Sequence, residues 1–499
     1  MAAAQGVTAA GAAAPTPPTR LERAGLLAGP LLFLLVLLVP APVTMSAPAH
    51  RVAALTAWMA TWWLSTPVPL QATALLPLVM LPVLGVAGFD QAAAPYANNV
   101  IFLFLGGFFI AAAMERWGLH KRVAFGILAL VGTDARRVVL AFMLATGFIS
   151  MWISNTATAV MMMPMAMAVL VLARQSREDA AGKAGMGAAL VLGIAYAASI
   201  GGMATLIGTP PNAIFAASVR QLLHENVGFG EWMSVGVPIA VILLPACWLV
   251  LTTVFPTRGP IPGLAERLAS ERAALGPLRG GERFTLIVFL LAVAGWILRD
   301  PKTLGAFTIP GIATYAPAIT DSGIAIIASL LLFAVPFDWR ARGGWAFALD
   351  WKTARTSPWG MLLLFGGGLS LADAFLESGL SSWLGSVLGG MAGLPTAVVI
   401  LGVATVFMFF TELASNAAVT AMAMPLLVGI APALGQEPRL LMAVAALSAS
   451  CAFMLPVSTP PNTVAFSTGE VTVREMFRAG LLLNLTAIGV ISAAALVLL

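Results

Sequence analysis

The chain of 499 residues is 60% hydrophobic and only 9% charged, and its mean hydropathy is +0.95. So few charged residues cannot cover the surface of a soluble protein of this size, so we expect nearly the whole chain to lie in a lipid bilayer. The net charge of +5 then reflects membrane orientation and does not indicate nucleic-acid binding.

The chain opens with a segment that differs from the rest. Residues 1–24 are mostly Ala, Pro, Gly and Thr and predict a disordered tail. Beyond them, apolar runs close to the roughly 20 residues that a helix needs to cross a bilayer predict eleven membrane spans. We interpret the first as a retained span and not as a cleaved signal peptide. The spans are expected near residues 25–41, 52–66, 70–87, 98–115, 188–219, 232–255, 284–298, 322–337, 359–377, 440–466 and 480–499.

Residues 138–173 form an uncharged run of 36 residues that one span does not explain. As a single helix the run would reach about 54 Å, against about 30 Å of hydrocarbon. Basic residues stand at both ends, with Arg137 before the run and Arg174 after it, so both ends are expected in the cytoplasm. A re-entrant hairpin with its tip near residues 154–156 satisfies both observations. Non-helical backbone at that depth has to line a polar cavity, so the tip is a candidate binding site.

The basic residues also predict the orientation of the chain, because Lys and Arg accumulate in cytoplasmic loops. With a cytoplasmic N-terminus and eleven spans, five of the 26 basic residues fall outside and the remaining 21 inside. We therefore predict a multi-pass protein of the cytoplasmic membrane. The five outer residues are Arg51, Arg220, Arg299, Lys302 and Arg439.

An internal repeat links two distant parts of the chain. A shift of 261 residues superposes Ser150 on Thr411 and Ser154-Asn155 on Ser415-Asn416, and Thr-Pro-Pro-Asn at 209–212 recurs at 459–462. Five spans separate the two Ser-Asn motifs, so the second hairpin, expected within 382–434, should enter from the opposite side. Inverted repeats with broken helices are typical of secondary transporters. A channel or an enzyme is less expected from this symmetry, and no nucleophile, base and orienting group occur together for an enzyme.

Each Thr-Pro-Pro motif is expected to break a helix in a defined way. Proline lacks an N–H and disfavours helical backbone before it, yet it suits the first turn of a new helix. Thr209 and Thr459 are therefore predicted as N-caps of two half-helices, whose free N–H groups favour an anion. No Lys or Arg lies beside the tips. Sodium, a hard cation, would take the oxygen ligands of the same tips and of the unwound backbone.

With these paired motifs, the chain resembles the divalent anion:sodium symporter family over nearly all of residues 25–499. The resemblance implies a homodimer in which a transport domain moves like an elevator and carries a dicarboxylate with several sodium ions. It implies a first sodium site made by Ser150, Ser154, Asn155 and Gly208, and a second made by Thr411, Ala414, Asn416 and Ser458. It implies that the substrate carboxylates meet Ser154, Asn155, Thr156, Thr209, Ser415, Asn416, Thr459 and Pro460.

The same resemblance divides the chain beyond the tail. Scaffold helices are expected at 25–134, first-repeat transport elements at 135–255, a cytoplasmic loop and further scaffold helices at 256–380, and second-repeat transport elements at 381–499.

One departure from the family pattern concerns the substrate. Ala417 stands where threonine is frequent, which removes a hydroxyl from the expected pocket. Sodium-coupled symport of C4-dicarboxylates is our first hypothesis. The alternatives are sodium-independent anion exchange, transport of citrate or sulfate, and proton coupling through the intramembrane acid Glu412.

Overall fold

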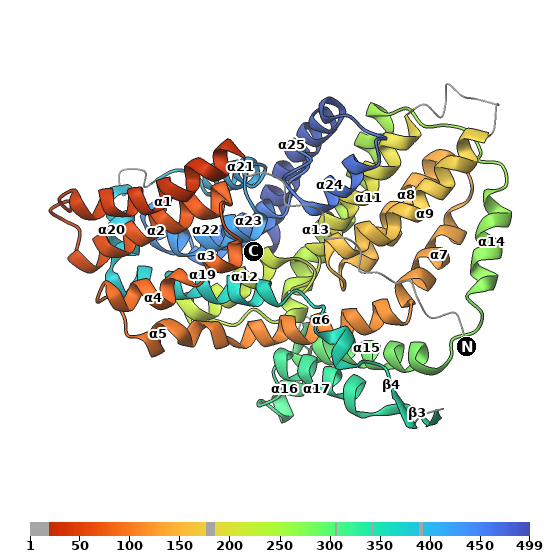
Figure 1. Ribbon diagram of the computed structural model, residues 1–499, viewed down its shortest axis with the longest axis horizontal. Helices are drawn as coiled ribbons and strands as arrows, with labels where there is room; N and C mark the ends of the chain where they lie inside the picture. Colours follow the sequence, from red (N-terminus) through yellow and green to blue (C-terminus); the bar gives the residue numbers. More distant parts are fainter. Residues whose placement is uncertain (1–18, 176–184, 305–306, 342–343, 389–392) are drawn as a thin grey trace, which may run out of the picture.

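The computed structural model describes residues 19–175, 185–304, 307–341, 344–388 and 393–499 (Figure 1). Residues 1–18 of the predicted tail lie outside this part. The first helix, α1 (Arg20–Leu38), begins five residues before the expected boundary. Thr19 caps it, because its hydroxyl accepts from the N–H of Glu22 while the Glu22 carboxylate accepts from the N–H of Thr19.

The described chain consists of helices with two small antiparallel hairpins. The first half forms, after α1, the elements α2 (Ala47–Ser65), α3 (Leu70–Thr73), α4 (Leu76–Val83), α5 (Phe89–Ala93), η1 (Ala94–Ala97), α6 (Asn99–Arg116), α7 (Leu119–Val131), α8 (Ala135–Ser150), α9 (Asn155–Gln175), α11 (Met186–Gly202), α12 (Pro210–Ser218), η2 (Val219–Leu223) and α13 (Phe229–Val254).

The second half repeats this order with two hairpins added. It forms α14 (Leu264–Ala274), α15 (Gly280–Arg299), β1 (Lys302–Leu304), β2 (Phe307–Ile309), α16 (Ile312–Tyr315), α17 (Asp321–Ala334), β3 (Pro336–Ala341), β4 (Gly344–Phe347), α18 (Trp351–Ala354), α19 (Trp359–Ser378), α20 (Leu380–Leu388), α21 (Thr396–Thr411), α22 (Asn416–Ile430), η4 (Pro432–Leu434), α23 (Pro438–Ala449), α24 (Pro460–Ser467) and α25 (Val473–Leu498).

The predicted repeat is confirmed element by element. α8 and α21 differ by 261 residues at both ends, and so do the starts of α9 and α22. The turns that precede them match as well: Gly118 (φ 72°) separates α6 from α7, and Gly379 (φ 79°) separates α19 from α20. Both turns need a left-handed backbone, which glycine adopts without steric cost. The superposed glycines of the sequence therefore mark the same bend in each half.

Both predicted re-entrant hairpins are present, as α8–α9 and α21–α22. In the second region, 382–434, the sequence did not separate α20 from the hairpin; α20 is a distinct helix that packs on α22. Among the described residues, seven helices are long and apolar enough to cross a membrane, and α9 of the first hairpin is one of them. Both arms of the second hairpin, α21 and α22, are shorter apolar helices. The fold is that of an all-α polytopic membrane protein.

The core of the fold surrounds α11. Every residue of Met186–Gly202 is buried, because α8, α9, α13 and α24 pack around this helix. In Figure 1 the yellow helices α8 and α9 and the blue helices α24 and α25 gather beside it, so the ends of the two repeats share one core.

Two of the residues predicted to lie outside, Arg439 and Arg220, make polar contacts around the start of α13. Arg439 forms ion pairs with Glu225 and Glu231 at the start of α13, and Arg220 donates to Asn226. At the opposite end of the bundle, Arg174 pairs with Glu470. Which of these two ends faces the cytoplasm stays a prediction.

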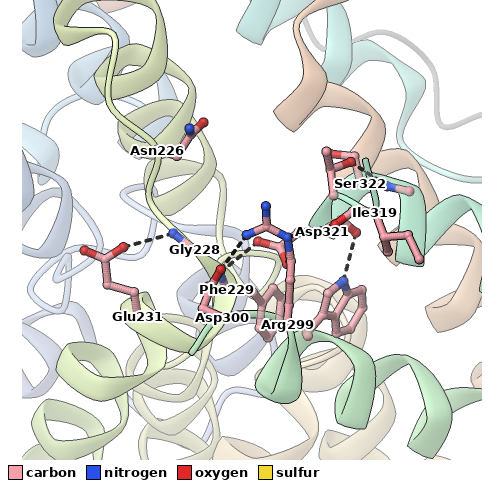
Figure 2. A network of polar contacts seen from close by, with 12 residues as sticks. Asn226, Gly228, Phe229, Glu231, Arg299, Asp300, Ile319, Asp321 and Ser322 are labelled. Carbon is pink, nitrogen blue, oxygen red and sulfur yellow. Dashed lines mark hydrogen bonds and ion pairs between the residues drawn. The ribbon is translucent and has the colours of Figure 1, made fainter. Parts of the chain in front are cut away.

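A polar network near the start of α13 joins three helix ends (Figure 2). The Asp321 carboxylate at the start of α17 accepts from the N–H of Phe229, the first residue of α13, at 3.0 Å. Arg299 at the end of α15 lies 3.7 Å from Asp321 and donates to Asp300 at 2.7 Å. We call Phe229, Arg299, Asp300 and Asp321 the closing network, because it holds the start of α13 against α15 and α17.

Candidate functional site

The first hairpin tip, residues 151–154, carries a buried hydroxyl beside an amide. The hydroxyl of Ser150, the last residue of α8, donates to the carbonyl of Ala198 in α11 at 2.7 Å and lies 2.8 Å from the side-chain amide of Asn155. Ser154 accepts from the N–H of Ala157 at 3.3 Å, so it caps α9 and ends the tip. These three predicted site residues therefore lie together against the central helix.

Oxygen atoms surround the Asn155 side chain. The amide atom that faces Ser150 also lies 3.1 Å from the carbonyl oxygen of Ala198 and 3.2 Å from that of Gly208. The hydrogen-bonding groups around it are satisfied when this atom is the amide nitrogen, whose two hydrogens are shared among the three oxygens. With the amide turned over, four oxygens converge, an arrangement that a bound cation would stabilise. An oxygen cluster of this kind suits a hard cation such as sodium. It brings together Ser150, Asn155 and Gly208 of the predicted first sodium site.

Two glycines make this close approach possible. A Cβ at Gly202 would lie 2.4 Å from the Asn155 amide oxygen, and a Cβ at Gly208 would lie 2.4 Å from the carbonyl oxygen of Gly202. Gly208 was predicted as a ligand through its carbonyl, whereas Gly202 was missed. Its spacing from Thr-Pro-Pro carries no chemical signal, since glycines are frequent in apolar helices.

The second tip, residues 412–415, repeats the first. Thr411 donates to the Asn416 amide oxygen at 2.8 Å and to the carbonyl of Ala449 at 2.9 Å. The matching distances in the first repeat are 2.8 Å and 2.7 Å. The serine and the threonine at equivalent positions thus each contact the asparagine of their own tip and a carbonyl near the end of the helix that packs beside it.

The remaining predicted ligands of the second site are Ala414 and Ser458. Both are buried. The Ser458 hydroxyl donates to the carbonyl of Leu455 at 2.7 Å and accepts from Asn462 at 3.2 Å, so it is engaged within its own loop. Ala414 can serve a cation only through its carbonyl oxygen, and we expect Ser458 to do the same.

Thr209 and Thr459 stand at the N-caps of the half-helices α12 and α24, as predicted, with extended backbone and proline in the first turn. The Thr459 hydroxyl accepts from the N–H of Asn462 at 3.4 Å, whereas the Thr209 side chain makes no capping bond. Both threonines are buried. Each half-helix therefore begins inside the bundle, with its free N–H groups at the level of the break.

The asparagine that ends each Thr-Pro-Pro-Asn motif has a role that the sequence did not assign. Asn212 donates to the carbonyls of Gly202, Met203 and Thr205, at 3.2, 3.2 and 2.7 Å. Asn462 donates to the carbonyls of Ala452 and Leu455, both at 3.0 Å. Each amide satisfies carbonyls that the broken helix leaves free, so it fixes the shape of the break. The motif itself was the signal, because a fully buried asparagine must find partners.

The residues expected to meet the substrate differ in exposure. Ser154, Thr156 and Pro460 are exposed, and Ser415 and Asn416 are half-buried. Ala417 is buried, although its counterpart Thr156 is exposed. The expectation that Ala417 removes a hydroxyl from an open pocket is therefore not supported, because a side chain at 417 would point into packed protein.

The two half-helices are covered unequally. α12 packs on α6, α19, α22 and α23, and all its residues after Pro210 are buried. α24 packs chiefly on α9 and α11, and Thr463, Phe466 and Ser467 are exposed. Val457, just before α24, is 83% exposed. One side of α24 is therefore left uncovered by the chain, near the end of the bundle where Arg174 pairs with Glu470.

Two hairpin tips and two half-helix starts, related by an inverted repeat inside a membrane-spanning bundle, define a secondary transporter and not an enzyme. The family described as "Sodium:sulfate symporter transmembrane region" matches residues 22–498, and the chain belongs to this family, the divalent anion:sodium symporters.

Two relatives agree with this assignment, and two solved structures share the fold. The Sodium-dependent dicarboxylate transporter SdcS of Staphylococcus saprophyticus is 40% identical over 472 residues, 94% of this chain and 89% of the relative. SdcS of Staphylococcus aureus is 39% identical over 466 residues, 92% and 88% of the two chains. The YdaH transporter of Alcanivorax borkumensis has a TM-score of 0.52 at 14% identity, and MtrF of Neisseria gonorrhoeae has 0.56 at 14%. The match to YdaH covers 96% of this chain and 98% of YdaH. The match to MtrF covers 96% of this chain and 94% of MtrF. Both matches support the fold alone.

Proposed function

We propose that this protein is a sodium-coupled symporter of C4-dicarboxylates such as succinate, malate and fumarate. The observation that carries the proposal is the oxygen cluster at Asn155 and its counterpart at Asn416, in a chain whose relatives are named sodium-dependent dicarboxylate transporters. Clusters of neutral oxygens hold a cation stably when the co-transported substrate supplies the negative charge.

Each repeat would hold one sodium ion. In the first, the hydroxyl of Ser150, the amide of Asn155 and the carbonyl of Gly208 converge, and Ser154 stands at the tip beside them. In the second repeat, Thr411 and Asn416 occupy the matching positions. Ala414 and Ser458 would add carbonyl oxygens.

The dicarboxylate would bind between the tips. Its carboxylates would meet the hydroxyls of Ser154, Thr156 and Ser415, the two amides, and the N–H groups that α12 and α24 leave free at their first turns. The two bound cations would complete the charge balance, since no Lys or Arg lies at either tip.

For transport, we propose an elevator motion in a homodimer of the cytoplasmic membrane, with a cytoplasmic N-terminus. Residues 135–255 and 381–499 would move against the scaffold of residues 25–134 and 256–380. With this orientation, the exposed α24 would face the cytoplasm, as expected for an inward-open state. A movement of residues 135–255 and 381–499 toward the outside would uncover α12 and cover α24.

Succinate uptake into proteoliposomes tests the proposal. We expect accumulation when an inward sodium gradient is imposed, and little when choline replaces sodium. If more than two sodium ions accompany each dianion, an inside-negative potential should increase uptake, because each net charge gains about 2.3 kcal/mol per 100 mV. Citrate and sulfate, added as competitors, measure the selectivity.

Uptake that proceeds equally without a sodium gradient would contradict the proposal. Counterflow that is indifferent to sodium would favour the anion exchanger in its place.

A further inference from the structure

Glu412 is a buried carboxylate inside the second hairpin tip, directly after Thr411. Its oxygens accept from the N–H groups of Phe453 at 2.7 Å, Met454 at 2.9 and 3.1 Å, and Leu455 at 3.3 Å. Asn484 of α25 donates to it at 2.8 Å. One side chain therefore binds three successive peptide groups of the second break, residues 450–459.

In the first repeat, the N–H groups at the equivalent break find hydrogen-bond acceptors without a carboxylate. The shift of 261 places Met151 at the position of Glu412. There the N–H groups of Met203 and Ala204 bond to helix carbonyls three residues earlier, at 3.3 and 3.0 Å. Their counterparts, Phe453 and Met454, bond to Glu412. The carboxylate thus takes the place of the last helical carbonyls.

The second break is correspondingly longer. α11 continues to Gly202, whose counterpart at an offset of 250 is Ala452, but α23 already ends at Ala449. The helix stops three residues early, and the N–H groups that this releases would be unsatisfied in the membrane without Glu412. Asn462 holds the carbonyls of the same segment at Ala452 and Leu455. Glu412 therefore binds the N–H groups of the segment, and Asn462 binds its carbonyl groups.

This segment leads directly into the second cation site. Leu455, whose N–H bonds to Glu412, accepts from the hydroxyl and the N–H of Ser458. Thr411, the residue before Glu412, holds the amide of Asn416. The carboxylate consequently sits between the two elements from which the second site is built, while the first site has the uncharged Met151 in its place.

We propose that Glu412 is a positioning residue for the second cation site, and that as a fixed anion it makes this site bind sodium more tightly than the first. The inference rests on the proposed sodium coupling. Every hydrogen-bond partner of its oxygens is a donor, which suits the ionised carboxylate and leaves no acceptor for a proton. Glu412 therefore serves as a stationary charge and not as the proton carrier of the alternative hypothesis.

The test is the stabilisation of the purified protein by sodium chloride, with choline chloride at equal ionic strength as the reference. A cation that binds only the folded state raises Tm in proportion to its occupancy, so the titration reports binding without transport. In Glu412→Gln, the sodium concentration that gives half of the maximal rise in Tm should increase about tenfold or more, because charge-assisted hydrogen bonds and a nearby anion are lost. Asn484→Ala should shift it in the same direction by less.

Ser370→Ala is the matched control. This buried hydroxyl of α19 donates to the carbonyl of Ala92 at 2.8 Å, outside the transport elements. Its loss should lower Tm but leave the sodium concentration for half the effect unchanged. Glu412→Asp keeps the charge on a shorter side chain, so its sodium concentration for half of the maximal rise in Tm should lie between those of the wild type and Glu412→Gln.

An unchanged sodium titration in Glu412→Gln would overturn the role of Glu412 while leaving sodium coupling intact. If Glu412→Gln does not fold, Asn484→Ala decides, and an unshifted titration in that variant would overturn the proposal as well. A wild type that sodium does not stabilise would instead contradict the proposed function itself.

Discussion

The half-helices α12 and α24 begin with the same Thr-Pro-Pro-Asn sequence and differ in nearly everything around it. α12 is enclosed by α6 and α19, while one side of α24 is left uncovered by the chain. The chemistry of the two repeats is matched at Ser150 and Thr411, to within 0.2 Å in both hydrogen bonds. Identical motifs are therefore placed in unequal surroundings, which is what a transporter open to one side at a time requires.

The comparison separates two kinds of residue. Asn155 and Asn416 belong to the symmetric part, since each lies beside a buried hydroxyl at its tip. The asymmetric part includes Gly202, whose counterpart is Ala452, and Glu412, whose counterpart is Met151. It also includes the closing network, which we do not assign to the repeat. Substitutions in the first group should impair the cation sites equally, and those in the second should affect one repeat or one face.

The largest effect is expected from the symmetric pair. Asn155→Ala and Asn416→Ala each remove the amide from an oxygen cluster, so each should abolish sodium-driven succinate uptake, by about 100-fold or more. Thr405→Ala, which removes an exposed hydroxyl of α21, is the control and should transport normally. Unaltered uptake in both asparagine variants would refute the assignment of the sites.

Gly202→Ala should impair only the first cation site. The added Cβ would lie 2.4 Å from the Asn155 amide oxygen, so the amide has to move. We expect uptake to fall by more than tenfold, with sodium concentration for half-maximal uptake raised. Gly402→Ala is the matched control, because nothing lies within 4 Å of a Cβ there. Equal rates in the two variants would show that the close approach is not needed.

Thr156 and Ala417 test the unequal exposure of equivalent positions. Thr156→Ala removes an exposed hydroxyl from the proposed substrate face, and we expect KM for succinate to rise about five- to tenfold while the response to sodium is kept. Ala417→Thr adds a hydroxyl at a buried position, so it should lower Tm without improving KM. A lower KM in Ala417→Thr would place residue 417 in the pocket after all.

The closing network should bias the direction in which the site opens. Asp321→Asn weakens its contacts with Arg299 and with the N–H of Phe229 (Figure 2), so α12 should become accessible more often, by about threefold. A cysteine at Ser218, buried at the end of α12, reports this through its rate of labelling in a background lacking Cys247 and Cys451.

The matching reporter is Ser467→Cys at the exposed end of α24, which should label quickly in both backgrounds. Glu266→Gln, on the exposed α14, is the control and should change neither rate. Faster labelling at both positions in Asp321→Asn would indicate general loosening and contradict a role in closing one side.

Much of this arrangement could be predicted from the sequence, because it depends on local patterns. An uncharged run too long for one span predicts a hairpin, and Thr-Pro-Pro predicts a break at Thr209 and Thr459. The glycines at 118 and 379 mark equivalent bends for the same reason. Local backbone chemistry determines each of these features, so no knowledge of distant contacts was needed.

The remainder depends on contacts between distant segments. Nothing local predicts that Gly202 must be small for Asn155, or that Glu412 binds peptide groups about 40 residues later. The separate helix α20 was missed because its short apolar run merges with the hairpin that follows. The unequal covering of α12 and α24 was equally unpredictable, since it results from how the two halves pack and not from either motif.

The most direct test of the account is the dependence of initial succinate uptake on sodium concentration in wild-type proteoliposomes. Two matched cation sites that must both be filled predict a sigmoidal curve with a Hill coefficient above 1, and Gly202→Ala should shift that curve to higher sodium. A hyperbolic curve, or uptake independent of sodium, would contradict the claim that both repeats hold a coupling cation.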